Sequence, residues 1–130
     1  MNNAQYTEKV MCHFLHPKNM GEMKNPDAVG TVGNPRCGDI LKIMIKISKN
    51  KQQEPIIKNI KFQTFGCTAA IASSSVLTTL AKGLTIKKAK KITNKDVASA
   101  LDSLPPIKMH CSNLAADALR KAIDEWEKKK

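Results

Sequence analysis

Three cysteines stand in three separate segments of this 130-residue chain, at positions Cys37, Cys67 and Cys111. Dozens of residues separate them, and no two form a Cys-x-x-Cys pair, which disfavours a zinc finger or zinc ribbon. Thiolates are soft ligands that favour zinc, cuprous copper or iron–sulfur clusters. Any site that these thiols form must therefore be assembled by the fold, from three parts of the chain.

Two further donors accompany the cysteines. Asp39 follows Cys37 by two residues, so in an extended backbone both side chains point to the same side. His110 directly precedes Cys111, and carboxylate and imidazole groups suit zinc and iron. Three thiolates with one of these donors would complete a tetrahedral zinc site or the four ligands of a [2Fe–2S] cluster. Five candidates for four places leave the fourth ligand open.

Length and composition indicate one globular domain over residues 1–130. The chain is 42% hydrophobic and 25% charged, which disfavours wholesale disorder. It has no apolar run as long as a membrane span, and its amino terminus does not resemble a signal peptide. We therefore expect a cytoplasmic protein, without a membrane partner, whose cysteines are reduced rather than joined in disulfides.

The net charge of +11 raises the question of nucleic-acid binding. Lysine dominates the basic residues, which cluster in 82–95 and at 128–130, and the stretch 82–95 contains no aromatic residue. Nucleic-acid sites usually combine basic side chains with stacking aromatics or an arginine-rich element. We interpret the charge as a source of solubility and partner steering, and predict no nucleic-acid partner.

The first half of the chain predicts one helix and a small sheet. Residues 4–16 have helical periodicity and end at Pro17; within them Cys12 is expected to be a small buried hydrophobe. Residues 17–38 predict a long connection, with a short edge strand at 29–32. Alternation over 39–47 and 56–65 predicts an antiparallel hairpin. Its expected inward positions are Leu41, Ile43, Ile45 and Ile47 in the first strand, and Ile56, Ile60 and Phe62 in the second.

The second half predicts helices over 67–82, 85–92, 94–104 and 110–128. Gly83 is expected to end the first, and Thr85 and either Thr93 or Asn94 to cap the next two. Cys67 and Cys111 then open helices, where unpaired N–H groups and the helix dipole lower the pKa of a thiol.

Four blocks of the sequence match a known pattern: Pro17-Lys18-Asn19-Met20-Gly21, Cys37-Gly38-Asp39, Thr64-Phe65-Gly66-Cys67 with Ala70 to Ser75, and Leu104-Pro105-Pro106-Ile107-Lys108-Met109-His110-Cys111. In these blocks the chain resembles the IscU-type iron–sulfur cluster assembly scaffolds and the amino-terminal domain of NifU. Thr68 and Thr79 depart from the residues usual in that family, which are glycine and glutamate. The related SufU group has an insertion between the second and third cysteines and lacks the histidine found here at His110.

The resemblance implies an α+β sandwich, in which a three-stranded, mostly antiparallel sheet packs against helices. It implies a non-enzymatic scaffold that takes sulfur from a cysteine desulfurase, binds iron, builds a [2Fe–2S] cluster and transfers it to apo acceptor proteins. It implies that Cys37, Cys67 and Cys111 are ligands completed by Asp39 or His110, with zinc in the cluster-free form.

Further partners follow from the same resemblance. Cys111 is the implied persulfide acceptor, and Leu104, Pro105, Pro106, Ile107 and Lys108 form the implied binding motif for Hsp70- or J-type chaperones. An iron donor and a monomer or cluster-bridged dimer are also implied. The alternatives that stay open are a zinc-dependent, SufU-like sulfur acceptor and a basic, zinc-stabilised nucleic-acid module.

Overall fold

The computed structural model describes residues 7–34, 39–65, 68–101 and 109–129, and for residues 34, 39 and 109–113 it describes the backbone only. Its elements follow the order α1 (Glu8–Leu15), β1 (Ala28–Asn34), β2 (Asp39–Lys49), β3 (Pro55–Thr64), α2 (Thr68–Ala81), α3 (Ile86–Ala89), α4 (Asn94–Ala100) and α5 (Met109–Lys128).

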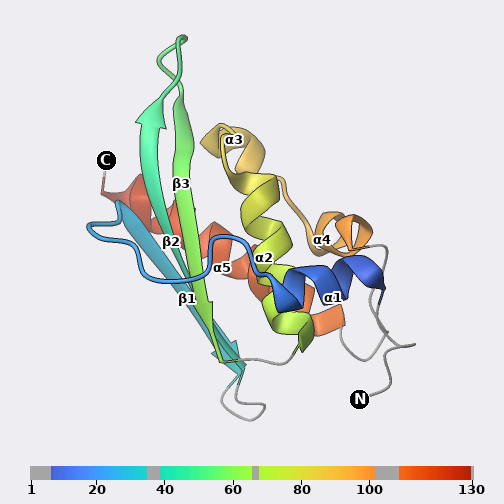
Figure 1. Cartoon of the computed structure of the whole chain (residues 1–130). Coiled ribbons are helices and arrows are strands. Elements are labelled where there is room, and N and C mark those ends of the chain that lie inside the picture. The colour runs from blue at the N-terminus through green and yellow to red at the C-terminus, as the bar shows by residue number, and fades with distance from the viewer. Residues whose placement is uncertain (1–6, 35–38, 66–67, 102–108, 130) are drawn as a thin grey trace.

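The three strands form an antiparallel sheet in the order β1-β2-β3 (Figure 1). Gly30, Ile43 and Phe62 lie in one row across it. Met20 forms one parallel bridge to Phe62 at the outer edge of β3. The predicted α+β class and hairpin are confirmed, and the edge strand expected at 29–32 is longer at both ends.

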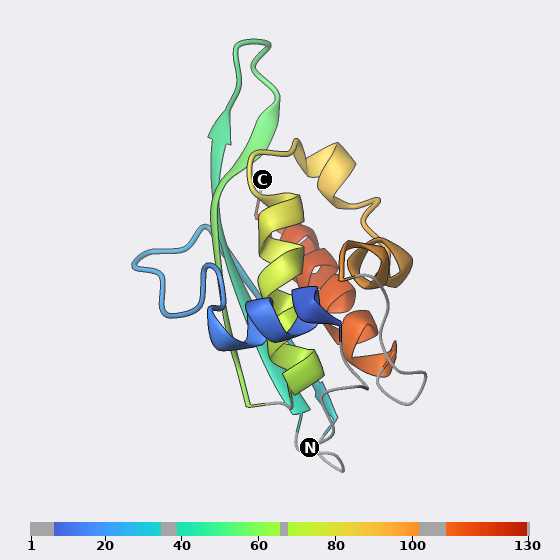
Figure 2. The same cartoon turned by 45° about the vertical axis from the view of Figure 1, so that its right-hand side comes forward.

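The helices cover one face of the sheet, while the connection between α1 and β1 lies on the other (Figure 2). Helices α2 and α5 pack on the strands, and α1 packs on α2. The core between these layers is aliphatic, in keeping with an aromatic content of 4%. Its largest buried side chains include Phe62, Ile43, Ile45, Leu77 and Leu119.

Helix α2 is buried along most of its length, which explains its alanine- and serine-rich sequence. It lies between the sheet, α1 and α5, so small side chains are needed for close approach. Gly83, at φ 87°, ends the helical segment in the left-handed region that favours glycine. Its N–H donates to the carbonyl oxygen of Ile57 at 2.8 Å, which ties the end of α2 to β3.

A register shift in the β2–β3 pair corrects the predicted inner face of β3. Asn59 pairs with Lys46 and Ile57 pairs with Ile47, so Lys58 is an extra residue. The shift makes Ile57 fully buried, with Ile60 and Phe62, whereas Ile56 is only half-buried. The prediction that Ile56 is one of the inward-facing residues of β3 was therefore wrong.

Two further expectations need correction. Cys12 was predicted to be buried, but it is exposed, because α1 turns Val10 rather than Cys12 into the core. The alternation also predicts that Met44, between Ile43 and Ile45, lies on the polar side of β2. Met44 is instead buried, since the segment around Asn25 crosses that face: the Nζ of Lys46 donates to the Asn25 carbonyl oxygen at 2.8 Å.

The predicted helix caps are confirmed, with Thr93 rather than Asn94 as the second. Thr85 accepts a hydrogen bond from the N–H of Lys88, and Thr93 forms a capping box with Asp96. Both capped helices are shorter than predicted, and residues 102–104 lie outside the described part of the chain. Within the described ranges, no helix is long and apolar enough to cross a membrane.

Candidate functional site

The segment that carries Cys37 joins two paired strand ends. Strand β1 ends at Asn34 and β2 begins at Asp39, and these two residues are partners in the sheet. Cys37 itself lies outside the described residues, between these two anchors. The antiparallel pairing therefore fixes both ends of its segment at one end of the sheet.

The segment that carries Cys67 begins beside the same strand ends. The hydroxyl of Thr64 donates to the carbonyl oxygen of Ile40 at 2.7 Å, and the N–H of Phe65 donates to the same oxygen at 3.2 Å. Cys67 also lies outside the described residues, and α2 begins at the next position, Thr68. The described residues that flank Cys37 and Cys67 are therefore held side by side, at Asp39 and Ile40, the first two residues of β2.

The direction of α5 brings the third segment toward this end. The Nζ of Lys129 donates to the Asp27 carbonyl oxygen at 3.4 Å, and the Nζ of Lys121 donates to that of Thr31 at 3.3 Å. Helix α5 therefore runs antiparallel to β1, and its first turn, which contains the backbone of His110 and Cys111, is directed toward the end where β1 stops (Figure 1).

The residue types in these segments would allow chemistry with soft metals at this end of the molecule, if their side chains converge. A helix start offers unpaired N–H groups and the positive end of the helix dipole, both of which stabilise a thiolate. The side chains of the predicted ligands, and the predicted chaperone motif at 104–108, are outside what the structure describes. The predicted ligands Cys37, Asp39, Cys67, His110 and Cys111 therefore stay a prediction.

Two apolar side chains beside this end were not singled out from the sequence. Phe65 is 84% exposed and Ile40 is 44% exposed, and the backbones of these residues are hydrogen-bonded to each other. Large exposed apolar side chains that lie together are typical of protein–protein contact surfaces. The available signal was the position of Phe65 at the end of a strand, just before Gly66 and Cys67.

His13 belongs to a structural hydrogen-bond network that links α1 to α2. Its Nδ1 lies 2.7 Å from the hydroxyl oxygen of Ser75, which also accepts the N–H of Lys18 at 2.8 Å. Burial, and then the nearby Lys18 ammonium, lower the pKa of His13 below 6.5. In the described part of the chain, no group of three or more His, Cys, Asp or Glu side chains is arranged to bind a metal.

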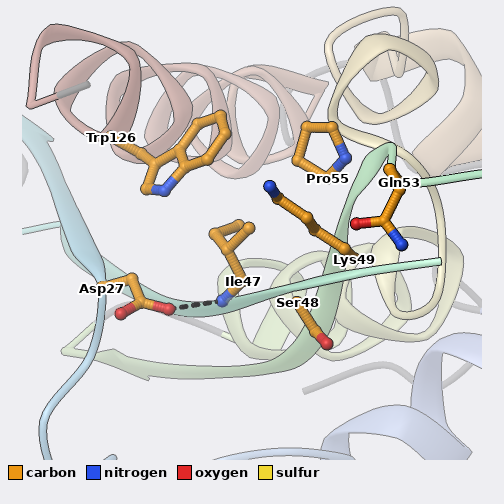
Figure 3. Close-up of a pocket in the computed structure, with 7 residues that line it drawn as sticks. All are labelled: Asp27, Ile47, Ser48, Lys49, Gln53, Pro55 and Trp126. Carbon is orange, nitrogen blue, oxygen red and sulfur yellow. Dashed lines mark hydrogen bonds between the residues drawn. The ribbon is translucent and has the colours of Figure 1, made fainter.

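A hollow of about 400 Å³ lies at the opposite end of β2, between Trp126 and the β2–β3 hairpin (Figure 3). Trp126 and Pro55 form apolar walls, and Lys49 extends between them. The carboxylate of Asp27 at its rim already accepts the N–H of Ile47 at 2.6 Å. This hollow has no soft donor and is not a candidate metal site.

Comparisons with known proteins identify relatives over almost the whole chain. The family described as NifU-like N terminal domain matches residues 5–130. "Iron-sulfur cluster assembly scaffold protein IscU 1" of Archaeoglobus fulgidus is 56% identical over 124 residues, which cover 95% of this chain and 78% of that protein. "Iron sulfur cluster assembly protein 1" of Trachipleistophora hominis is 50% identical over 127 residues, covering 95% and 88%. The protein of that name from Debaryomyces hansenii, described as mitochondrial, is 45% identical over 128 residues, covering 96% and 69%.

Solved structures support the fold. The amino-terminal NifU-like protein from Brucella abortus has a TM-score of 0.77 at 17% identity, covering 98% of each chain. A putative scaffold protein of the SUF system from Fervidobacterium islandicum has a TM-score of 0.74 at 20% identity, covering 95% of this chain and 99% of that one. At these identities the likeness establishes the fold alone.

Proposed function

Because this chain belongs to the NifU-like N-terminal domain family, we propose that it is a scaffold for iron–sulfur cluster assembly. In this role it binds iron and sulfide as substrates, holds the new cluster, and passes it to acceptor proteins. It is not an enzyme that turns over a substrate, in keeping with its relative from Archaeoglobus fulgidus, which is named a scaffold protein and is 56% identical.

The observation that carries this proposal is the course of the described residues beside three cysteine-bearing segments: two sets of these residues lie at one end of the sheet, and α5 is directed toward the same end. The Asn34–Asp39 pair anchors the first segment, and the hydrogen bonds to the Ile40 carbonyl oxygen anchor the second. The antiparallel course of α5 along β1 directs the third to the same end. Each segment carries one cysteine, which supports a shared site.

We assign the cluster to the thiolates of Cys37, Cys67 and Cys111, with Asp39 or His110 as the fourth ligand. The cargo we propose is a [2Fe–2S] cluster, which takes four protein ligands. In its absence the same set suits zinc, which three thiolates and one harder donor bind tetrahedrally. Both assignments rest on residue types and segment anchors.

Cys111 is our candidate for the sulfur acceptor. It lies in the first turn of the 20-residue helix α5, where the helix dipole favours the thiolate that sulfur exchange requires. That thiolate would attack the outer sulfur of a persulfide on a cysteine desulfurase, and the desulfurase thiolate would leave. Release of the sulfur from Cys111 as sulfide would then take two electrons from an external reductant, such as the excess thiol in the assay.

The remaining elements of the proposal concern partners and setting. An iron donor, apo acceptor proteins and an Hsp70- or J-type chaperone that binds residues 104–108 complete the partner set, and a monomer or cluster-bridged dimer is the expected assembly. Residues 1–130 are proposed to act as one domain. The cytoplasmic location stays a prediction, since relatives such as that of Debaryomyces hansenii are described as mitochondrial.

Anaerobic reconstitution tests the function directly. The protein is incubated with ferrous iron, cysteine and a cysteine desulfurase, and its iron, sulfide and visible absorption are measured. We expect a coloured protein with equal amounts of iron and sulfide. A colourless, zinc-containing protein that still accelerates desulfurase turnover would instead support the SufU-like sulfur acceptor.

Single serine substitutions supply matched controls. Cys67→Ser, Cys37→Ser and Cys111→Ser should each lose most of the bound iron and sulfide. Cys12→Ser should retain both, because Cys12 is exposed on α1, outside the three segments. Loss of the cluster in Cys12→Ser with retention in Cys67→Ser would overturn the assignment.

A further inference from the structure

The connection between α1 and β1 crosses the face of the sheet opposite the helices (Figure 2). Its residues 22–24 line one side of a groove, and residues of β2 and β3 line the other. This segment is tied down on both sides. The N–H of Gly21 donates to the Phe62 carbonyl oxygen at 2.9 Å, and that of Asp27 donates to the Ile45 carbonyl oxygen at 2.8 Å. The groove is therefore bounded by an anchored wall.

Four lysines surround this groove, which encloses about 290 Å³. Lys24 and Lys58 are exposed, and Lys46 and Lys61 are half-buried in its floor. One carboxylate, that of Glu22, faces them, so the groove has an excess of positive charge. Its complete lining is Glu22, Met23, Lys24, Lys46, Lys58, Asn59 and Lys61, and we call it the lysine groove.

The lysine groove is held in shape without neutralising its charge. The Nζ of Lys46 donates to the carbonyl oxygen of Asn25 at 2.8 Å, and Asn25 adopts the left-handed φ of 52° that turns the chain there. The ion pairs found among the described residues involve none of the four lysines. Clustered like charges in a concavity raise the local potential and attract ligands of the opposite sign.

We propose that the lysine groove docks a segment of a partner protein rich in aspartate and glutamate. Lysine presents a compact ammonium charge, whereas planar, paired recognition of phosphate favours arginine, which is absent from the lining. The lining also has no aromatic side chain on which a nucleobase could stack. An acidic polypeptide therefore fits this chemistry better than a nucleic acid.

The lysine groove lies away from the cysteine-bearing end of the sheet. Lys46 is six residues along β2 from Ile40, or about 20 Å at the rise of a strand. A partner held in the lysine groove would leave the cysteine-bearing end of the sheet open. The proposal does not require a bound cluster and is tested on the metal-free protein.

Fluorescence anisotropy with a labelled peptide of ten glutamates tests the proposal. The wild-type protein should bind the peptide at low salt and release it as salt screens the charges. The variant Lys24→Gln/Lys58→Gln/Lys61→Gln should bind about tenfold more weakly, because each exposed charge pair contributes modestly. Lys46 is left intact because it also holds the wall of the groove.

The matched control is Lys87→Gln/Lys88→Gln/Lys91→Gln, which removes the same charge from exposed lysines in and beside α3. It should change the affinity by less than about twofold if the groove is the site. Equal weakening in both variants, or no binding by the wild type, would overturn the proposal. The proposal would also be wrong if the wild type bound a single-stranded oligonucleotide more tightly than the peptide, and if only the groove variant lost that binding. The groove would then be a nucleic-acid site.

Discussion

Gly30 of β1 lies directly against the backbone of α5 at Ala118. A Cβ atom on Gly30 would overlap the carbonyl oxygen of Ala118 and the backbone nitrogen of Ala122, and would stand 3.0 Å from the Cβ of Lys121. Strand and helix can approach this closely only because no side chain separates them. This contact sets the distance between β1 and the helix whose first turn carries Cys111.

Gly30→Ala should therefore destabilise the protein by about 2–3 kcal/mol, the cost of forcing extra volume into a packed site. Chemical denaturation measures the change. Gly83→Ala is the comparison, because no heavy atom lies within 4 Å of its added Cβ and only its φ of 87° opposes the substitution. That variant should lose about 1 kcal/mol. If both lose the same amount, the close packing of β1 on α5 does not limit stability.

Two buried serines of α2 should differ in how their replacement by alanine changes the free energy of unfolding. Among the described residues, the buried hydroxyl oxygen of Ser73 has no hydrogen-bond partner, whereas that of Ser75 contacts His13 and Lys18. Ser73→Ala should change the free energy of unfolding by less than about 0.5 kcal/mol or increase it, and Ser75→Ala should lower it by about 1–2 kcal/mol. A large loss in Ser73→Ala would mean that this hydroxyl is bonded after all.

His13 should make stability depend on pH. Its Nδ1 lies 2.7 Å from the Ser75 hydroxyl oxygen, which also accepts the N–H of Lys18, and a neutral imidazole can make this contact as donor or as acceptor. Because burial and the Lys18 ammonium lower the pKa of His13 below 6.5, the unfolded chain binds its proton first. Stability should therefore be full above pH 6.5 and decrease as the pH falls below that value toward the folded-state pKa.

Urea unfolding at pH 7.5 and at lower pH measures this dependence. His13→Gln keeps a polar side chain without a titrating group, so its stability should change less over the same pH range. His16→Gln is the matched control, because His16 is exposed at the end of α1 and should leave the dependence intact. An unchanged pH dependence in His13→Gln would exclude this histidine as its source.

Much of the fold could be predicted because its physical signals are local. Alternating isoleucines predicted β2 and β3, and Thr85 and the pair Thr93 and Asn94 predicted the helix starts. The extra residue Lys58 could not be predicted, because a bulge depends on how two strands pair and not on either sequence alone. The burial of Met44 depends in the same way on a distant segment crossing the sheet.

The candidate site, too, could be predicted only in its locally encoded parts. Residue type and spacing predicted which segments would carry ligands, and the paired ends at Asn34 and Asp39 support their meeting. Choosing between Asp39 and His110 as fourth ligand requires side-chain geometry that sequence does not encode locally. The exposed pair Ile40 and Phe65 was missed because apolar residues at strand ends are usually counted as core.

Zinc removal should loosen the cluster-free protein. If the three cysteines bind zinc with one harder donor, a strong chelator should lower the melting temperature by about 10 °C, as expected for loss of a tight ligand from a small domain. Thiols must lose protons to bind zinc, so the affinity for zinc should also decrease as the pH is lowered. Elemental analysis should find zinc in wild type and Cys12→Ser, and little in Cys67→Ser. Absence of zinc together with an unchanged melting curve would refute this prediction.

Asp39→Ala should make the cluster longer-lived. A scaffold must release its cargo, and a carboxylate oxygen is a harder donor that matches cluster iron less well than sulfur does. Asp39 begins β2 at the end of the segment that carries Cys37, so we expect it to compete for iron and to open the site to incoming ligands. Without it, three thiolates and His110 would hold the cluster.

We expect the lifetime of the cluster in the presence of a chelator to increase roughly tenfold in Asp39→Ala, the scale on which groups around a metal alter its binding. Transfer to an apo-ferredoxin should slow correspondingly. Asp124→Ala, which removes an exposed carboxylate from α5, should leave both rates unchanged. Faster cluster loss in Asp39→Ala would show that this aspartate is an ordinary ligand, and the stabilising fourth donor would then be the carboxylate rather than His110.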